Sequence, residues 1–184
     1  MSIVEDARKG IITEEMKVVA AQEGVTEDFI RRGIASGQIV IPVSPYRKVK
    51  LCGIGGGLRT KVNCSVGTST DIVDVDMEVE KVKAGERAGA DTIMELSTGG
   101  DFVEIRRRCI EATTLSVGSV PLYQAFIEAA RKDGAVIHMR EDDLFRITEE
   151  QAKLGTNFMA IHTGVNRITL ERLQRQGRHG GLCS

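Results

Sequence analysis

The chain has 184 residues, of which 41% are hydrophobic and 28% are charged, so it is long enough to bury the core of one ordinary domain. Its 25 Lys and Arg residues are balanced by 26 Asp and Glu residues, and the two signs alternate along the chain, which disfavours nucleic acids and membrane surfaces as partners. No apolar stretch approaches the roughly 20 residues of a membrane span, and the acidic N-terminus does not resemble a signal peptide. The composition predicts a cytoplasmic protein.

The first forty residues are predicted to form short helices. Ser2 and Glu5 have the spacing of a capping box, and further caps and stops are expected at Thr13 and Thr26 and at Gly10, Gly24 and Gly37. Residues 39–50, IVIPVSPYRKVK, contain two prolines that forbid helix and predict an extended linker. We therefore expect an N-terminal helical region with its linker over residues 1–52 and a second unit over residues 53–184.

From residue 53 onward, apolar β-rich runs alternate with amphipathic helical stretches. Strands are predicted at 58–66, 91–97, 115–123, 157–163 and 180–184, and helices at 76–89, 101–112, 124–134, 141–155 and 167–177. This alternation is typical of βαβ units that build a parallel sheet.

Two α/β folds fit this pattern: a complete five-stranded doubly wound sheet, or a (β/α)8 TIM-type barrel of which about five strands are present. Polar side chains are expected at four successive strand ends, namely Asn63, Glu95 with Ser97, Tyr123 and His162. A barrel collects its site from the carboxyl ends of many strands, whereas a doubly wound sheet uses one switch point. We therefore predict a partial barrel that follows a small helical region, with Ser184 inside its fifth strand.

The glycine-rich segment GIGGGL, residues 53–58, does not match a nucleotide-binding fingerprint, because no G-K-[ST] occurs and a strand is expected to follow. It is predicted to lead into the first barrel strand. There Arg59, Lys61 and Asn63 alternate with other residues and share one strand face, which must meet a ligand or polar partners if it is buried.

The sequence contains no spacing typical of a metal site. Its four cysteines and three histidines are widely separated; they are Cys52, Cys64, Cys109, Cys183, His138, His162 and His179. No C-x-x-C pair and no helical histidine pair occurs among them, so we expect no metal site made wholly within this chain.

Single residues at the expected strand ends allow two interpretations each. Met94 is either core filling or a ligand contact. Tyr123 needs a polar partner for its hydroxyl, and His162 is either a satisfied core residue or a proton-transfer or orienting group at the mouth of a barrel.

Taken in order, several segments resemble the phosphomethylpyrimidine synthase family over essentially the whole chain. These segments are GIITEEM, IASGQIVIP, GIGGGLRTKVN followed by GTS, IMELSTGG, SVPLYQA, AVIHMREDDLF and IHTGV. The chain departs from the family at Cys64, Ser65 and Val66, where an alanine-asparagine-isoleucine run is usual, and at Gly56, which replaces a common lysine.

The resemblance implies an N-terminal helical domain, a (β/α)8 barrel and a C-terminal segment that holds a [4Fe-4S] cluster on three cysteines. It implies thiamine biosynthesis, in which S-adenosylmethionine is cleaved to a radical that rearranges 5-aminoimidazole ribotide into hydroxymethylpyrimidine phosphate, with zinc as a further metal. Asn63, Met94, Tyr123 and His162 carry over as substrate contacts. The cluster motif and the later metal-binding histidines are absent from this sequence, so we expect the chain to be inactive alone.

Three alternatives stay open at this point. The first is a sister enzyme that uses the same ribotide to make 5-hydroxybenzimidazole. The second is a non-catalytic partial barrel that acts by association, and the third is a self-contained doubly wound binding domain. An open barrel exposes apolar strand edges, so the sequence also predicts a homo-oligomer.

Overall fold

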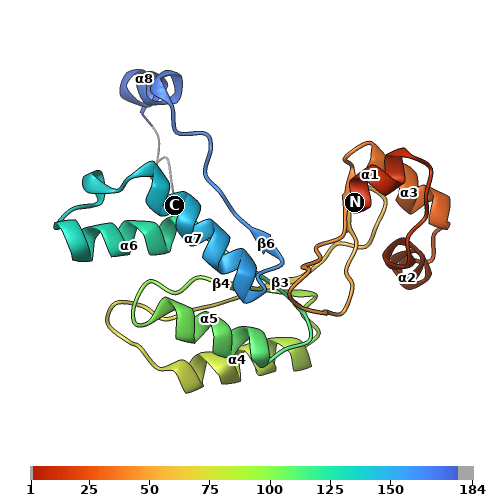
Figure 1. Cartoon of the computed structure of the whole chain (residues 1–184), viewed down its shortest axis with the longest axis horizontal. Coiled ribbons are helices and arrows are strands. Elements are labelled where there is room, and N and C mark those ends of the chain that lie inside the picture. The colour runs from red at the N-terminus through yellow and green to blue at the C-terminus, as the bar shows by residue number, and fades with distance from the viewer. Residues whose placement is uncertain (1, 178–184) are drawn as a thin grey trace.

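The computed structural model describes residues 2–177. Its first three helices, α1 (Ile3–Arg8), α2 (Glu14–Glu23) and α3 (Glu27–Ala35), form a separate group at the right of Figure 1. The capping box at Ser2 is confirmed, and the Thr26 hydroxyl accepts the Phe29 N–H as expected. Thr13 lies at its predicted N-cap position but makes no capping hydrogen bond.

The N-terminal helices share an apolar core of their own. It contains Met16, Val19, Ile30, Ile34 and Ile39, all almost fully buried. Ile39 belongs to β1 (Ile39–Val40), which pairs antiparallel with β2 (Ile54–Gly55). The predicted linker therefore begins with a strand, and the glycine-rich segment pairs with that strand instead of leading directly into the main sheet.

The main sheet has four parallel strands in the order β3 (Asn63–Val66), β4 (Thr92–Glu95), β5 (Ser116–Ser119) and β6 (Phe158–Met159). The helical segments between and after them are α4 (Val75–Arg87), α5 (Phe102–Glu111), α6 (Pro121–Asp133), η1 (Val136–His138), α7 (Glu141–Leu154) and α8 (Arg167–Gln176). In Figure 1, α8 lies apart from α4–α7, at the end of an extended segment. Among residues 2–177, no helix combines the length and apolar character that a bilayer crossing requires.

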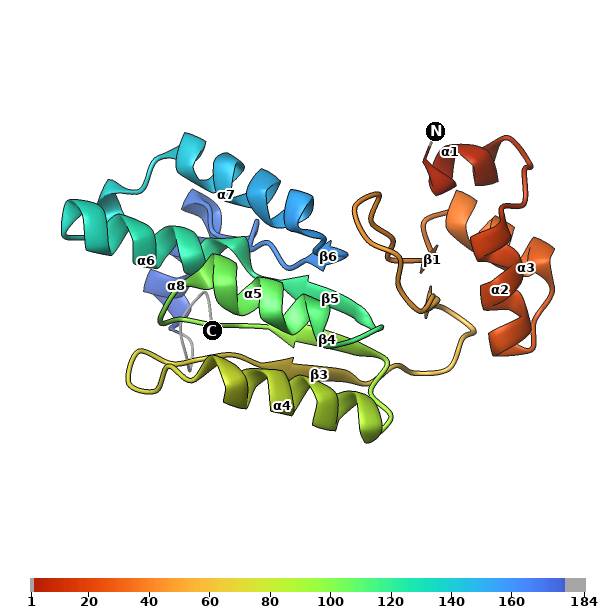
Figure 2. The same cartoon turned by 60° about the horizontal axis from the view of Figure 1, so that its bottom comes forward.

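The strand order favours the barrel interpretation over the doubly wound one. Each described strand lies beside its sequence neighbour, as Figure 2 shows, and the order never reverses. A doubly wound sheet contains a reversal, whereas a (β/α) barrel adds its strands in sequence. The observed sheet is therefore compatible with part of a barrel, and the fifth strand predicted at 180–184 lies outside the described residues.

The two faces of the sheet differ in what covers them. Val66, Ile93 and Val117 are buried in one cluster with residues of α4 and α5, so these positions face the helices. Successive side chains alternate across a strand, which places Ser65, Met94 and Gly118 on the opposite, inner face. The inner face is the one that a barrel would enclose.

Ion pairs join the N-terminal helices to the start of the sheet. Lys61 lies 2.8 Å from the Glu23 carboxylate at the end of α2, and each side chain is only 7% exposed. Arg59 pairs with Asp91, and its backbone N–H donates to Glu23 at 2.8 Å. The prediction that Arg59, Lys61 and Asn63 share one strand face is therefore wrong. β3 begins only at Asn63, and the two cations before it pair with carboxylates of this chain.

This ion-paired junction predicts a loss of stability in acid. Burial alone would raise the pKa of Glu23, but the Lys61 ammonium and the Arg59 N–H outweigh it and lower that pKa below its ordinary value of 4.5. The Arg59 guanidinium likewise lowers the pKa of Asp91 below 3.8. Each carboxylate therefore contributes its full share to the free energy of unfolding at a pH above its ordinary pKa. This contribution is lost as the pH falls through the lower pKa of the folded state.

Glu23→Gln tests this junction. At pH 7 the variant should melt below the unmodified chain, and the gap between the two melting temperatures should narrow as the pH is lowered from about 5 to about 2.5. A gap that stays constant over this range would show that the Glu23 charge does not stabilise the junction. Glu14→Gln is a suitable control, because Glu14 pairs with Lys17 on an exposed helix surface.

Candidate functional site

The candidate site is the inner face of the sheet near the carboxyl ends of its strands. Ser65, Met94 and Gly118 lie side by side in one row across β3, β4 and β5, and Phe158 of β6 pairs with Gly118. Met94 is 8% exposed. A side chain at Gly118 would overlap the Phe158 ring, so this position must be glycine for the ring to lie against β5.

Asn63 does not lie in this row. The prediction placed it at a strand end that faces a site, but it is the first residue of β3 and therefore lies at the amino end of the sheet. Its side-chain oxygen accepts the Thr92 hydroxyl at 2.9 Å. The predicted strand and β3 both end at Val66, but β3 begins only at Asn63, so Ser65 is the β3 residue beside Met94 and Asn63 lies on the same inner face, two residues nearer the amino end.

Tyr123 lies in a helix and not in a strand. Pro121 occupies the first position of α6, where its missing N–H costs nothing, and the Tyr123 N–H donates to the Val120 carbonyl at 3.1 Å. The predicted strand 115–123 therefore ends at Ser119. Tyr123 is half-buried and follows the carboxyl end of β5 within one helical turn, so it lies at the end of the sheet where the site was expected.

His162 lies outside the observed strand, although the predicted strand 157–163 contained it. β6 ends at Met159, and His162 belongs to the extended, exposed segment that leads to α8. It also follows a carboxyl end, that of β6. Met94, Tyr123 and His162 therefore lie in or after three successive parallel strands, whereas Asn63 lies at the opposite end of the sheet.

The loops after β3 and β4 pack closely at the same end of the sheet. The Thr68 hydroxyl donates to the Gly99 carbonyl at 2.6 Å, and the Thr68 N–H donates to the Ser97 hydroxyl at 3.1 Å. The Thr98 N–H donates to the Thr68 carbonyl at 2.9 Å. These bonds satisfy buried polar groups and fix the two loops against each other. Ser97, expected to belong to a site, therefore holds a loop in place.

Glu95 faces the helices and not the candidate site. Its carboxylate lies 2.9 Å from Nε of Arg106 on α5, and the two side chains are 0% and 4% exposed. The approach is close but not aligned as a hydrogen bond; the second Glu95 oxygen accepts the Ser97 N–H at 2.7 Å. Burial lowers the pKa of Arg106, and the Glu95 charge acts in the opposite direction. The sequence held a signal for this placement. Glu95 follows the apolar Ile93 by two residues, and side chains two residues apart in a strand lie on the same face of the sheet.

The described cysteines do not form a metal site. Cys52, Cys64 and Cys109 are free thiols, and within residues 2–177 no three His, Cys, Asp or Glu side chains lie together as ligands. Burial raises the pKa of Cys109 to about 12, which keeps it in the thiol form. A [4Fe-4S] cluster needs several thiolates in one place, so these donors do not fit it. Cys183 and His179 lie outside the described residues.

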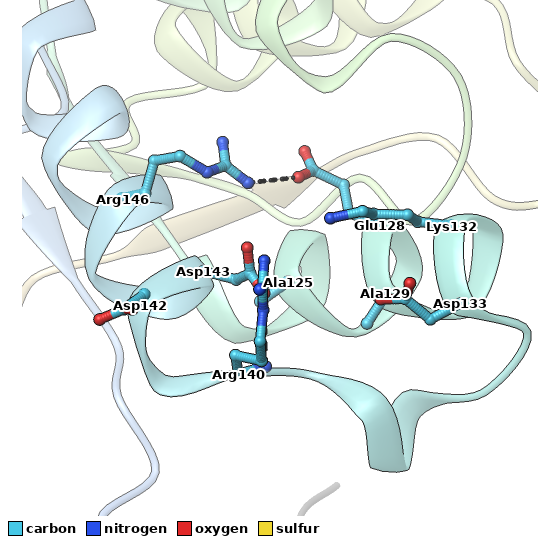
Figure 3. A pocket seen from close by; sticks show the side chains of 9 residues that line it. All are labelled: Ala125, Glu128, Ala129, Lys132, Asp133, Arg140, Asp142, Asp143 and Arg146. Carbon is cyan, nitrogen blue, oxygen red and sulfur yellow. Dashed lines mark hydrogen bonds and ion pairs between the residues drawn. The ribbon is translucent and has the colours of Figure 1, made fainter.

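A cavity of about 550 Å³ lies between α6 and α7 in the outer helical layer. Figure 3 shows its lining, in which Arg146 pairs with Glu128 at 2.9 Å. Arg140 pairs with Asp143 at 3.3 Å. These two pairs neutralise each other's charges, and none of the residues expected at the site lines this cavity, so we do not include it in the candidate site.

Comparison with known proteins identifies relatives of this chain. The family model described as the radical SAM ThiC family matches residues 2–184. A phosphomethylpyrimidine synthase of Methanoculleus marisnigri is 80% identical over 184 residues, which are all of this chain and 43% of that protein. A protein of the same name from Methanoregula boonei is 77% identical over the same share. The chain therefore spans less than half the length of these curated relatives.

Proposed function

The chain belongs to the radical SAM ThiC family, and we propose on this premise that it forms the first part of a phosphomethylpyrimidine synthase. In this proposal it contributes one side of the site that binds 5-aminoimidazole ribotide. The rearrangement to hydroxymethylpyrimidine phosphate requires the rest of the protein, so the 184-residue chain is inactive alone. The relatives that carry the enzyme's name support this assignment.

The observation that carries the proposal is the placement of Met94 within β4, Tyr123 shortly after β5 and His162 shortly after β6, all toward the carboxyl end of the sheet. In a barrel, side chains and loops at these ends converge on one ligand. The nearly buried Met94 offers an apolar surface to a ring, and Tyr123 and His162 offer hydrogen-bonding groups for the ribose and imidazole. Asn63 stays a predicted contact, because it lies on the same inner face as Met94, at the amino end of the sheet.

S-adenosylmethionine and a [4Fe-4S] cluster are the cofactors that the radical SAM family implies, and zinc is a further proposal. When bound, S-adenosylmethionine and the cluster would supply the radical that starts the rearrangement. This chain's residues have other roles. They bind and orient the ribotide, and the inner face of the sheet excludes water from one side of it.

A chimera tests the function. Residues 1–184 of this chain replace the matching 43% of the Methanoculleus marisnigri protein, and the purified, anaerobically reconstituted chimera is assayed with ribotide, S-adenosylmethionine and a reductant. We expect hydroxymethylpyrimidine phosphate as product, and none from the 184-residue chain. A folded chimera with its cluster and no product would reject the proposal. Formation of 5-hydroxybenzimidazole would assign the chain to the sister enzyme instead.

Self-association is a second proposal for the 184-residue chain. β3 and β6 form the two edges of the described four-stranded sheet, and each has an unpaired side. Light scattering at several concentrations should give a mass that rises above that of one chain. A monomeric mass at all concentrations would reject the proposed homo-oligomer. It would also count against the alternative of a partial barrel that acts by association.

A further inference from the structure

A buried polar network on the helix side of the sheet joins two of the three segments that carry the proposed contacts, those of Met94 and Tyr123. It runs from Ser119 at the end of β5 through Gln151 of α7 and Gln124 of α6 to Arg106 of α5, which pairs with Glu95 at the end of β4. We propose that Gln151 and Gln124 are positioning residues, which fix Tyr123 and the carboxyl ends of β4 and β5 in the arrangement that the ribotide requires. The part concerning the ribotide rests on the proposed function.

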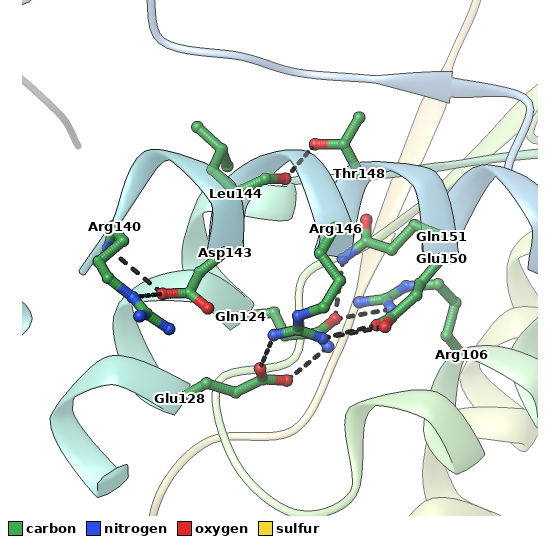
Figure 4. A network of polar contacts seen from close by, with 10 residues as sticks. All are labelled: Arg106, Gln124, Glu128, Arg140, Asp143, Leu144, Arg146, Thr148, Glu150 and Gln151. Atoms are coloured by element: carbon green, nitrogen blue, oxygen red, sulfur yellow. Dashed lines mark hydrogen bonds and ion pairs between the residues drawn. The ribbon is translucent and has the colours of Figure 1, made fainter. Parts of the chain in front are cut away.

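Each contact in the network is short and shielded from water. The Ser119 hydroxyl donates to the Gln151 oxygen at 2.7 Å, and the Gln151 amide N–H donates to the Gln124 oxygen at 2.9 Å. The Arg106 guanidinium donates to the same Gln124 oxygen at 3.0 Å. All four side chains belong to residues that are at most 3% exposed. Figure 4 shows Arg106, Gln124 and Gln151 converging from three helices.

The ends of the network fix its direction. Arg106 can only donate, so it requires the oxygen of Gln124 to face it. The Gln124 amide N–H then donates to Glu128 at 2.7 Å, and Arg146 holds the other Glu128 oxygen at 2.9 Å. Gln151 must therefore offer its N–H to Gln124 and its oxygen to Ser119. Neither amide can turn over without losing at least one bond to a buried partner.

The network residues are the direct neighbours of the candidate contacts. Glu95 follows Met94 in β4, and Gln124 follows Tyr123 in α6. Their side chains leave the backbone on the helix side, whereas Met94 lies on the inner face. A shift of Gln124 therefore rotates the first turn of α6, and Tyr123 moves with it. A shift of Arg106 releases Glu95, which holds the Ser97 N–H in the loop after β4.

Packing alone does not account for these residue types. Apolar side chains of the same size fill a buried space without the desolvation cost of amides and charges. A fully satisfied polar network instead selects one arrangement of the elements that it joins. Here it joins β4, β5, α5, α6 and α7, which carry two of the proposed contacts.

Fluorine NMR of the 184-residue chain tests the positioning directly. The chain has two tyrosines and no tryptophan, so labelling with 3-fluorotyrosine gives one signal for Tyr46 and one for Tyr123, assigned with Tyr46→Phe. Gln151→Met removes the amide 27 residues away from Gln124 in sequence and should shift or broaden the Tyr123 signal only. Ser119→Ala removes the hydroxyl that donates to Gln151, at the β5 end of the network, and should affect the same signal.

Ile147→Ala is the matched control, because Ile147 lies one turn earlier on α7, is 0% exposed and belongs to no polar network contact described above. It should lower the melting temperature and leave the Tyr123 signal in place. An unchanged Tyr123 signal in Gln151→Met and Ser119→Ala, or an equal change in Ile147→Ala, would overturn the positioning role.

Ribotide affinity in the chimera then separates the two proposals. Gln151→Met should weaken binding about fivefold or more, while Ile147→Ala changes it less than twofold. If the unmodified chimera binds no ribotide, the proposed function fails and the NMR result still decides the positioning role. If ribotide binds equally well to the chimera and to Gln151→Met, the network does not serve the site and the inference about the ribotide is rejected.

Discussion

Arg106→Met is expected to lower the free energy of unfolding by about 3–5 kcal/mol, because it leaves the Glu95 carboxylate buried without its cation. Glu95 is 1% exposed, and its oxygen lies 2.9 Å from the Arg106 guanidinium. The same change removes the Arg106 bond to Gln124 at 3.0 Å. Urea unfolding at neutral pH measures this loss.

Arg107→Met is the matched control on the same helix. Arg107 pairs with Glu104 and Glu111 at 2.8 Å, but its side chain is 43% exposed. Surface pairs of this kind contribute at most about 1 kcal/mol. Glu95→Leu combined with Arg106→Met should recover part of the lost stability, since no unpaired charge is then buried. Equal effects of Arg106→Met and Arg107→Met would show that the Glu95–Arg106 pair contributes no more than a surface pair.

Gly99→Ala is expected to lower the free energy of unfolding by about 2–3 kcal/mol and to loosen the loops after β3 and β4. An added methyl group would overlap the Ser69 carbonyl oxygen and lie 2.9 Å from its carbon, and 3.1 Å from the α-carbon of Thr70. These are backbone atoms, which cannot rotate away as a side chain does. The Gly99 carbonyl also accepts the buried Thr68 hydroxyl, so a displaced loop leaves that hydroxyl unpaired.

Gly56→Ala is the comparison variant, at a glycine in the turn after β2. A methyl group at Gly56 meets no atom within 4 Å, and its backbone φ lies outside the left-handed region. This variant should melt within a few degrees of the unmodified chain. Thermal unfolding of both variants decides the matter, and a neutral Gly99→Ala would mean that the two loops are not in close contact.

The sequence predicted the order and type of the elements because its periodicity reports burial. The amphipathic stretches at 76–89 and 101–112 became α4 and α5 within two residues at each end, since apolar side chains on one helix face must meet the sheet. Capping residues such as Ser2 and Asp101 also act through local hydrogen bonds, which the sequence specifies directly.

Strand ends were predicted less well, because a strand ends where its pairing partner ends. Nothing local marks Asn63 as the first paired residue of β3, and the apolar run through Tyr123 continues into α6 without a change of composition. The network from Glu95 to Gln151 was missed for the same reason. Its members are far apart in the sequence, and they meet only when three helices pack on one sheet.

Ribotide binding by the chimera tests the central claim most directly. Isothermal calorimetry of Tyr123→Phe and His162→Ala, with melting temperature recorded beside each, should show affinity weakened about five- to hundredfold per variant while the fold is retained. This range corresponds to the roughly 1–3 kcal/mol lost when a desolvated hydrogen bond is broken. Unchanged ribotide affinity in both folded variants would contradict the claim that these carboxyl-end residues form one side of the substrate site.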